Sequence, residues 1–166
     1  MASSGRPNDE SARPAPADVA ITLDSVVKRF GAVTALAGVS FTVRRGEVFG
    51  LLGHNGAGKT TTVRLLNGIV APDSGSARVL GLDPAVDGAT LRRHTGVLTE
   101  SATLEDRLTA SENLLVYGAI YRIQRERLQA RVRDLLEQFD LTDRADHRVA
   151  TFSHGMRQRL ALARVL

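Results

Sequence analysis

The stretch Gly53–Thr60, "GHNGAGKT", decides the fold class, because it matches G-x-x-x-x-G-K-[ST] at each fixed position. Small residues let the backbone curl closely around a polyphosphate, with successive N–H groups turned inward. Such a loop ends at a helix N-terminus, whose unpaired N–H groups and dipole favour negative charge. Lys59 supplies a point charge for the β- and γ-phosphates, and Thr60 a hydroxyl for Mg²⁺. The motif predicts a nucleotide-binding loop.

The residues on either side of the loop have the pattern that this motif requires. Residues 47–53, "EVFGLLG", form a nearly continuous apolar run, which is typical of a strand buried on both faces. A helix is expected after the loop, with Gly68 placed to close it. The apolar residues of that helix are Val63, Leu65, Leu66 and Ile69. A chance match in a glycine-containing loop is the alternative, and the order strand, loop, helix argues against it.

Composition narrows the class of protein. The chain has 166 residues, 43% of them hydrophobic, which fits one globular domain. It has no cysteine, which excludes a disulfide framework, a thiol nucleophile and a cysteine metal site. The formal net charge is +4, but its arginines are spread along the chain, so no nucleic-acid partner is expected. No apolar run has the length of a membrane span.

The chain changes in character along its length. Residues 1–18 are rich in Pro, Ser and Ala and lack the apolar stretch of a signal peptide, so a disordered tail is expected. Strands are predicted from β-branched content and flanking turn residues over 19–30, 38–47, 74–81 and 95–100. Helices are predicted from capping residues and apolar spacing over 109–123 and 125–141. The expected class is α/β, with a strand and phosphate-loop portion over 19–100 and a helical portion over 101–166.

The end of the chain carries a further helical pattern. Residues 151–154 look like a helix start, and an apolar stripe follows that should face the core. The stripe consists of Leu160, Leu162, Val165 and Leu166. The histidines outside the loop, His94 and His147, have no spacing that suggests a metal site, and 92–94 is expected to be a charged surface turn.

Two stretches carry a family resemblance. Residues 50–81, "GLLGHNGAGKTTTVRLLNGIVAPDSGSARVLG", resemble the ATP-binding subunit of ABC transporters. Residues 152–166, "FSHGMRQRLALARVL", resemble the signature motif of that family and its helix. The resemblance covers about 19–166. It implies a P-loop NTPase fold of the ABC type, with N-terminal antiparallel strands, an incomplete core sheet and a helical subdomain that carries the signature.

The resemblance implies ATP and Mg²⁺ as cofactors. Phe30 stands where the family stacks an aromatic ring on adenine, and a core Phe at a strand end is the alternative. Glu100 stands where the family usually has Gln, and offers an oxygen to Mg²⁺ or to the attacking water; a solvated Glu is the alternative. Thr60 is the implied Mg²⁺ ligand. The implied ATP-binding loop residues are Gly53, His54, Asn55, Gly56, Ala57, Gly58, Lys59, Thr60 and Thr61.

The signature departs from the usual L-S-G-G-Q. It consists here of Phe152, Ser153, His154, Gly155 and Met156. Ser153 and Gly155 keep the hydroxyl and the close backbone that would contact the γ-phosphate of ATP held by a partner subunit. His154 and Met156 differ from the pattern, and packing is the favoured role of Met156. This variant resembles exporters of the ABC-2 type more than importers.

The implied function is that of a subunit that couples ATP binding and hydrolysis to transport by an integral membrane permease. It would act as a homodimer or heterodimer in the cytoplasm, peripheral to the inner face of the cell membrane. The family's Walker B strand, catalytic Glu and switch His have no match here and are expected beyond Leu166. Without that strand, residues 47–53 should expose apolar surface. The alternatives are a non-hydrolysing ATP-binding module and a soluble ABC-type ATPase without a permease.

Overall fold

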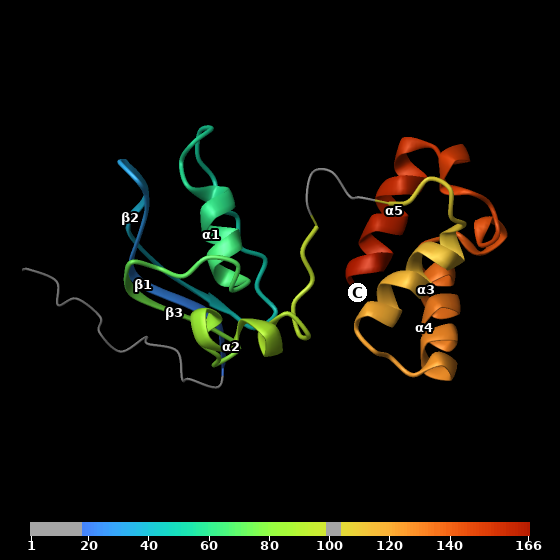
Figure 1. Cartoon of the computed structure of the whole chain (residues 1–166), viewed down its shortest axis with the longest axis horizontal. Coiled ribbons are helices and arrows are strands. Elements are labelled where there is room, and N and C mark those ends of the chain that lie inside the picture. Colours follow the sequence, from blue (N-terminus) through green and yellow to red (C-terminus); the bar gives the residue numbers. More distant parts are fainter. Residues whose placement is uncertain (1–17, 99–103) are drawn as a thin grey trace, which may run out of the picture. The chain divides into compact units, whose positions relative to one another are not determined.

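A computed structural model describes residues 18–98 and 104–166 of the chain. The chain forms two compact units, one that ends at Thr95 and one that begins at Gly96 (Figure 1). We call them the N-terminal unit and the C-terminal unit. The predicted boundary near residue 101 lies outside the described residues.

The N-terminal unit is built on a three-stranded antiparallel sheet in the order β2-β1-β3. Its strands are β1 (Val19–Phe30), β2 (Val33–Arg44) and β3 (Ser74–Val79). Strands β1 and β3 lie within the segments that β-branched content predicted, so those two expectations are confirmed. Strand β2 overlaps the predicted segment 38–47 but begins before it, at Val33, and ends at Arg44. The helix α1 (Lys59–Leu66) contacts β2 and β3 on one face of the sheet (Figure 1). The buried core of this unit consists of Leu23, Val26, Leu36, Leu65 and Ala77.

The prediction of a buried strand over residues 47–53 is wrong. This run carries no strand pairing in the part of the chain that the structure describes, and the side chains of Val48 and Leu52 are 99% and 92% exposed. The Phe49 ring is partly shielded from solvent because it stacks on the Phe41 ring, with centroids 4.9 Å apart. A strand exists only where a neighbour supplies its hydrogen bonds, and among the described residues none pairs with this run. The expected exposure of apolar surface is confirmed.

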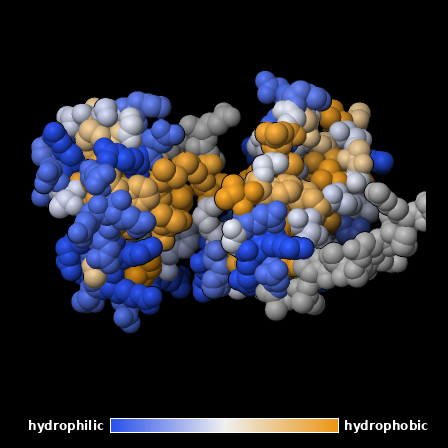
Figure 2. Space-filling model, turned by 180° about the vertical axis from the view of Figure 1, so that it is seen from behind, coloured by the Kyte–Doolittle hydropathy of each residue, from blue (hydrophilic) through white to orange (hydrophobic). Residues whose placement is uncertain are grey.

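The strand predicted over 95–100 also lacks a pairing neighbour in the part of the chain that the structure describes. Its described residues, 95–98, form no strand, and Val97 and Leu98 are 36% and 42% exposed. Figure 2 shows apolar side chains at the surface of both units. The remaining residues of that prediction, including Glu100, lie outside the described residues.

Helix α1 ends as its sequence predicted. Gly68 has a φ of +64°, and the amides of Gly68 and Ile69 donate to the carbonyls of Leu65 and Arg64. This is the Schellman pattern of helix termination, which favours glycine. The helix α2 (Pro84–Leu91), which the sequence analysis missed, packs on α1 and β3. A Cβ at Gly68 would overlap the carbonyl oxygen of Pro84 and lie 2.8 Å from Gly88 Cα.

The apolar positions of α1 are only partly those expected. Leu65 is fully buried, but Val63 is 41% exposed and Ile69 is 63% exposed. The second buried residue of the helix is Thr62, whose hydroxyl donates to the carbonyl of Gly58 at 3.0 Å. The face of α1 toward the sheet is therefore narrower and more polar than apolar spacing suggested.

The C-terminal unit consists of helices. They are α3 (Ala110–Ile120), α4 (Arg125–Gln138) and α5 (His154–Val165), with short 3₁₀ helices at Thr142–Arg144 and Val149–Thr151. Thr109 and Glu112 cap α3 reciprocally, since the Thr109 hydroxyl accepts from the Glu112 amide at 3.1 Å and the Glu112 carboxylate from the Thr109 amide at 2.8 Å. The predicted helices are thus confirmed. The buried residues of α4 are Leu128, Val132, Leu135 and Leu136.

The stripe predicted for the last helix is partly wrong. Leu160 is fully buried, but Leu162 is 38% exposed and Leu166 is 64% exposed. The other buried positions of α5 are Ala161 and Ala163, each 1% exposed. Small side chains let the helix approach its neighbours closely. Within the described residues, no helix combines the length and the apolar character needed to cross a membrane.

Two glycines with similar backbone angles test the packing of α1 on α2. Gly68→Ala should lower the free energy of unfolding by about 2 to 4 kcal/mol, because left-handed strain and overlap with Pro84 both act. Gly31→Ala, at a φ of +58° with nothing within 4 Å of the added Cβ, carries the strain alone and should cost about 1 to 2 kcal/mol. Urea unfolding of both variants measures the difference. Equal losses would contradict the close helix contact.

Asp73 fastens the start of β3 to the central strand. Its carboxylate accepts the Arg29 amide at 2.6 Å and the Lys28 ammonium at 3.0 Å. The Arg29 hydrogen bond, and then that of Lys28, lower the pKa of Asp73 below its ordinary value. A lowered pKa means that this contribution to stability is present above the unfolded pKa and is lost as pH falls through the folded pKa.

The carboxyl carbon of Asp73, followed by NMR during an acid titration, should therefore show a midpoint below the ordinary value of about 3.9 for aspartate. In Lys28→Met the midpoint should rise only part of the way, because the backbone donor remains. An Asp73 midpoint at or above the ordinary value would show that the contact to Arg29 does not form in solution.

Candidate nucleotide-binding site

The phosphate-loop motif forms an open loop that leads into α1. Gly56 and Gly58 both have a φ of +85°, a conformation that L-residues with side chains rarely adopt. Gly58 is the residue before the helix, and no side chain caps α1. Gly53–Ala57 are exposed, so a ligand could reach this part of the loop.

The start of α1 keeps its amide groups free. The structure gives no hydrogen-bond acceptor among the described residues for the amides of Lys59, Thr60 and Thr61. The Thr62 amide, by contrast, donates to the Gly58 carbonyl at 2.8 Å. Three adjacent donors at the positive end of a helix dipole are a site for an anion.

Lys59 crosses the loop. Its ammonium donates to the carbonyl of Gly53 at 2.6 Å and to the carbonyl of His54 at 2.8 Å. The two bonds hold the first residues of the motif over the helix start. An ammonium has three donors, so one stays available to a phosphate oxygen. His54 itself is exposed, and its Nδ1 lies 2.8 Å from the carbonyl oxygen of Asn55.

Two glycines of the motif are required by close contacts. A Cβ at Gly58 would overlap the Ala35 carbonyl oxygen and lie 2.6 Å from Leu36 Cδ2 of strand β2. A Cβ at Gly53 would lie 2.9 Å from Ala57 Cβ. The end of the loop therefore packs tightly against strand β2, and its first residue packs against Ala57 of the same loop. Glycine at these two positions allows the close backbone packing that a loop curled around a polyphosphate requires.

The helices differ in whether their first turn contains an acidic side chain. In the helices α2, α3 and α4 the first turn contains Asp87, Glu112 and Glu126, respectively. The first turns of α1 and α5 contain no acidic residue. A carboxylate there would stabilise the helix but repel an anion. Of the α-helices in the described residues, the two that begin at the predicted ATP-contacting motifs are the two without a carboxylate.

Phe30 lies in the N-terminal unit, at the end of β1. It is 48% exposed, so it is not the core Phe that was the alternative interpretation. The Lys28 ammonium lies 5.5 Å from its ring centroid, and Asp73 holds that ammonium. One face of the ring is thereby engaged by a cation. Stacking of adenine on the ring stays a prediction.

The signature residues lie in the C-terminal unit at the start of α5. Ser153 is the N-cap, and its hydroxyl accepts from the Met156 amide at 3.3 Å. Ser153, His154 and Gly155 are exposed, whereas Phe152 is 7% exposed within the helical core. Met156 packs against that core, so the packing role expected of it is confirmed. The start of α5 is a second exposed helix N-terminus.

The Thr60 hydroxyl is the candidate protein ligand for Mg²⁺ at this loop. The Thr60 side chain is exposed beside the free amides and makes no hydrogen bond within the described residues. Among those residues, no three His, Cys, Asp or Glu side chains gather into a metal site. Thr60 together with nucleotide phosphates is the donor set that suits Mg²⁺. Glu100, the other predicted ligand, lies outside the described residues.

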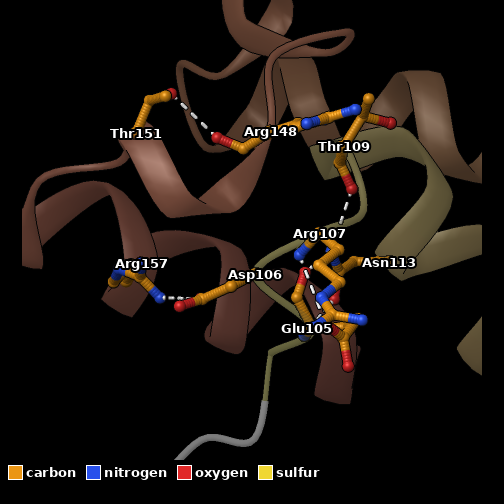
Figure 3. Close-up of polar contacts among 8 residues, drawn as sticks. All are labelled: Glu105, Asp106, Arg107, Thr109, Asn113, Arg148, Thr151 and Arg157. Atoms are coloured by element: carbon orange, nitrogen blue, oxygen red, sulfur yellow. Dashed lines mark hydrogen bonds and ion pairs between the residues drawn. The ribbon is translucent and has the colours of Figure 1, made fainter.

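No sequence pattern indicated the polar contacts around Glu105 and Asp106. Asp106 and Arg157 form an ion pair at 2.5 Å, and Asn113, which is 7% exposed, bonds the backbone at Glu105 (Figure 3). Asp106 and Arg157 are separated by 51 positions. No local spacing pattern reveals such a pair, because it forms only when the helical unit has folded.

Comparison with known proteins identifies the family. Residues 36–166 match the family model described as "ABC transporter". The chain is 43% identical over 147 residues to the daunorubicin resistance ATP-binding protein DrrA3 of Streptomyces coeruleorubidus, which covers 89% of this chain and 46% of that protein. It is 44% identical over 149 residues to the Nod factor export ATP-binding protein I of Paraburkholderia xenovorans, which covers 90% of this chain and 49% of that protein.

A solved structure shares the fold. The structure of cbiO1 from Clostridium perfringens, part of the ABC transporter complex cbiONQ, matches with a TM-score of 0.80 over 90% of this chain and 61% of that one, at 24% identity. This confirms the P-loop NTPase fold of the ABC type. The chain spans about half the length of the curated relatives named above. On the match of its residues 36–166, the chain belongs to the ABC transporter family.

Proposed function

We propose that this chain is part of the ATP-binding subunit of an ABC transporter, which binds ATP with Mg²⁺ and couples its hydrolysis to transport by a membrane permease. The observation that carries the proposal is the phosphate loop itself. Its amides at residues 59–61 are free, the Lys59 ammonium lies over the loop, and no carboxylate stands in the first turn of α1. These features favour a polyphosphate over a neutral ligand.

Each predicted residue has a role in this proposal. The amides at the start of α1 and the Lys59 ammonium would hold the phosphates, and the Thr60 hydroxyl would hold Mg²⁺. The bound Mg²⁺ supplies charge neutralisation of the phosphate oxygens. Phe30 would stack on the base, and Glu100 would contact Mg²⁺ or the attacking water. Residues 53–57 would line the phosphates through their backbone.

The second exposed helix start supports a paired arrangement. Ser153 and Gly155 lie in the C-terminal unit, and we propose that they contact ATP held by a second subunit rather than by their own. A Cβ added at Gly155 would meet nothing within 4 Å, so its backbone is open to approach. The start of α5 has no acidic residue in its first turn, and its amide donors could therefore meet a γ-phosphate.

The relatives favour transport over a soluble role. The names of two relatives describe drug resistance and Nod factor export, and both are ATP-binding proteins. We propose that this chain likewise serves a permease of the exporter kind, at the cytoplasmic face of the membrane. A steady-state ATPase measurement on a subunit that includes the expected Walker B strand and catalytic Glu would separate a hydrolysing subunit from a non-hydrolysing ATP-binding module.

Removal of the Lys59 ammonium tests the phosphate site. Lys59→Ala should weaken ATP binding by about tenfold to a hundredfold, because a hydrogen bond to a charged group is worth about 1.5 to 3 kcal/mol. Arg64→Ala is the matched control: it removes one positive charge from the exposed side of the same helix. Titration calorimetry measures both. An Arg64→Ala loss equal to that of Lys59→Ala would reduce the site to non-specific charge attraction.

Removal of the Phe30 ring tests the base contact. Phe30→Ala should weaken ATP binding by about twofold to tenfold, as an aromatic stacking contact of about 0.5 to 1.5 kcal/mol implies. Binding of inorganic triphosphate, which has no base, should not change. The affinity for GTP should fall as much as the affinity for ATP, since stacking does not depend on the hydrogen-bonding edge of the base. Equal losses for ATP and triphosphate would place Phe30 outside the base site.

A further inference from the structure

The segment 104–110 runs beside the segment that leads into α5. The Ala150 amide donates to the Asp106 carbonyl at 3.0 Å, and the Val149 amide donates to the Leu108 carbonyl at 2.9 Å. Thr109 and Arg148 form an antiparallel bridge. The two segments are therefore joined by backbone hydrogen bonds at several consecutive positions, and a shift of one displaces the other.

An ion pair extends this connection onto the helix itself. The Nη1 atom of Arg157 lies 2.5 Å from Oδ1 of Asp106, and the two side chains are 33% and 56% exposed, respectively (Figure 3). The Arg157 amide donates to the Ser153 carbonyl at 3.0 Å, which places this residue in the first turn of α5. A cation there opposes the helix dipole, and the Asp106 carboxylate offsets that cost. The hydrogen bond from Arg157 also lowers the pKa of Asp106 below its ordinary value.

The other side of the segment is fixed to α3. The buried Asn113 side chain accepts the Glu105 amide at 2.9 Å and donates to the Glu105 carbonyl at 3.0 Å. It also donates to the Thr109 carbonyl at 2.9 Å. Residues 105–109 are thus held at both ends by one side chain of α3. Asp106 projects from this braced segment to α5.

We propose that Asp106 and Arg157 are positioning residues, which set the orientation of the α5 start and transmit a displacement of segment 104–110 to Ser153 and Gly155. The proposal rests on the proposed function in one respect, the contact of Ser153 and Gly155 with a partner's ATP. The pair touches no nucleotide. It acts through the first turn of α5, where the loss of the ion pair frees Arg157 and loosens the turn that Ser153 caps.

Hydrogen exchange on the full chain tests the mechanical part without nucleotide. Asp106→Asn should raise the exchange rates of the Met156 and Arg157 amides by about twofold to fivefold, as the loss of one exposed ion pair implies. Asp140→Asn is the matched control, because Asp140 pairs with Arg159 of the same helix at 3.5 Å but, in the described part of the chain, forms no ion pair with segment 104–110. Its φ of +52° suits Asn. Unchanged rates in Asp106→Asn, or equal rises in both variants, would overturn the proposal.

The functional part is measured as ATP-dependent association of two copies of the chain. Asp106→Asn should weaken this association by at least about twofold while the affinity of one copy for ATP stays unchanged, because the loop at α1 is intact. Asp106→Glu, which keeps the charge, should recover most of the association. In a double-mutant cycle, Asp106→Asn combined with Arg157→Gln should cost no more than either change alone.

The two proposals fail in different ways. Parent chain that binds ATP but shows no ATP-dependent association would contradict the paired arrangement, while the exchange rates would still decide whether the pair orients α5. Association that Asp106→Asn leaves at the parental level would overturn the positioning role. Loss in Asp106→Glu equal to that in Asp106→Asn would also overturn it, because shape alone would then be responsible.

Discussion

A loop can present its amide groups to an anion only where the backbone takes angles that side chains disfavour. In this chain that constraint falls on Gly58, which combines a φ of +85° with a contact to Ala35 and Leu36 that leaves no room for a Cβ. The contact sets where α1 begins, and the start of α1 sets where the Lys59 ammonium and the Thr60 hydroxyl lie. The position of the phosphate site thus depends on strand β2 as much as on the motif. Hydrogen bonds from Lys59 to Gly53 and His54 then close the loop from the other side.

The parts of the fold that the sequence predicted well are those with local causes. The termination of α1 at Gly68 and the capping of α3 by Thr109 and Glu112 each depend on residues close together in the chain. Strands β1 and β3 have a local β-branched signal as well, although their pairing joins distant residues such as Ile21 and Val79. The run 47–53 was predicted as a buried strand and forms none, because pairing depends on a neighbour that local pattern cannot supply. Burial in α5 was misassigned for a related reason. Apolar size pointed to Leu162, whereas close helix packing selected the small Ala161 and Ala163.

The candidate site shows the same division. The loop residues and Ser153 are identifiable from their motifs, because phosphate binding needs particular residues at fixed spacing. The exposure of Phe30, which separates a stacking ring from a core residue, became visible only in the structure. The pair formed by Asp106 and Arg157 had no sequence signal, since its members come from distant segments. Motifs therefore predict which groups meet a ligand, and the folded unit determines what orients those groups.

Helices α1 and α5 both begin without a negatively charged side chain in the first turn, and each start is stabilised by different contacts. Both lack a carboxylate in the first turn, so neither gains the dipole stabilisation that Glu112 gives α3. At the start of α1 no side chain caps the helix. Gly58 packs against strand β2 there, and the Thr62 hydroxyl donates to the Gly58 carbonyl. Helix α5 uses the Ser153 cap and carries Arg157 in its first turn, and Asp106 then supplies the missing negative charge from outside the helix. A charge placed on a separate segment leaves the amides of the α5 start open to an anion. It also makes the stability of that start depend on where segment 104–110 lies, which is the physical basis for coupling the two.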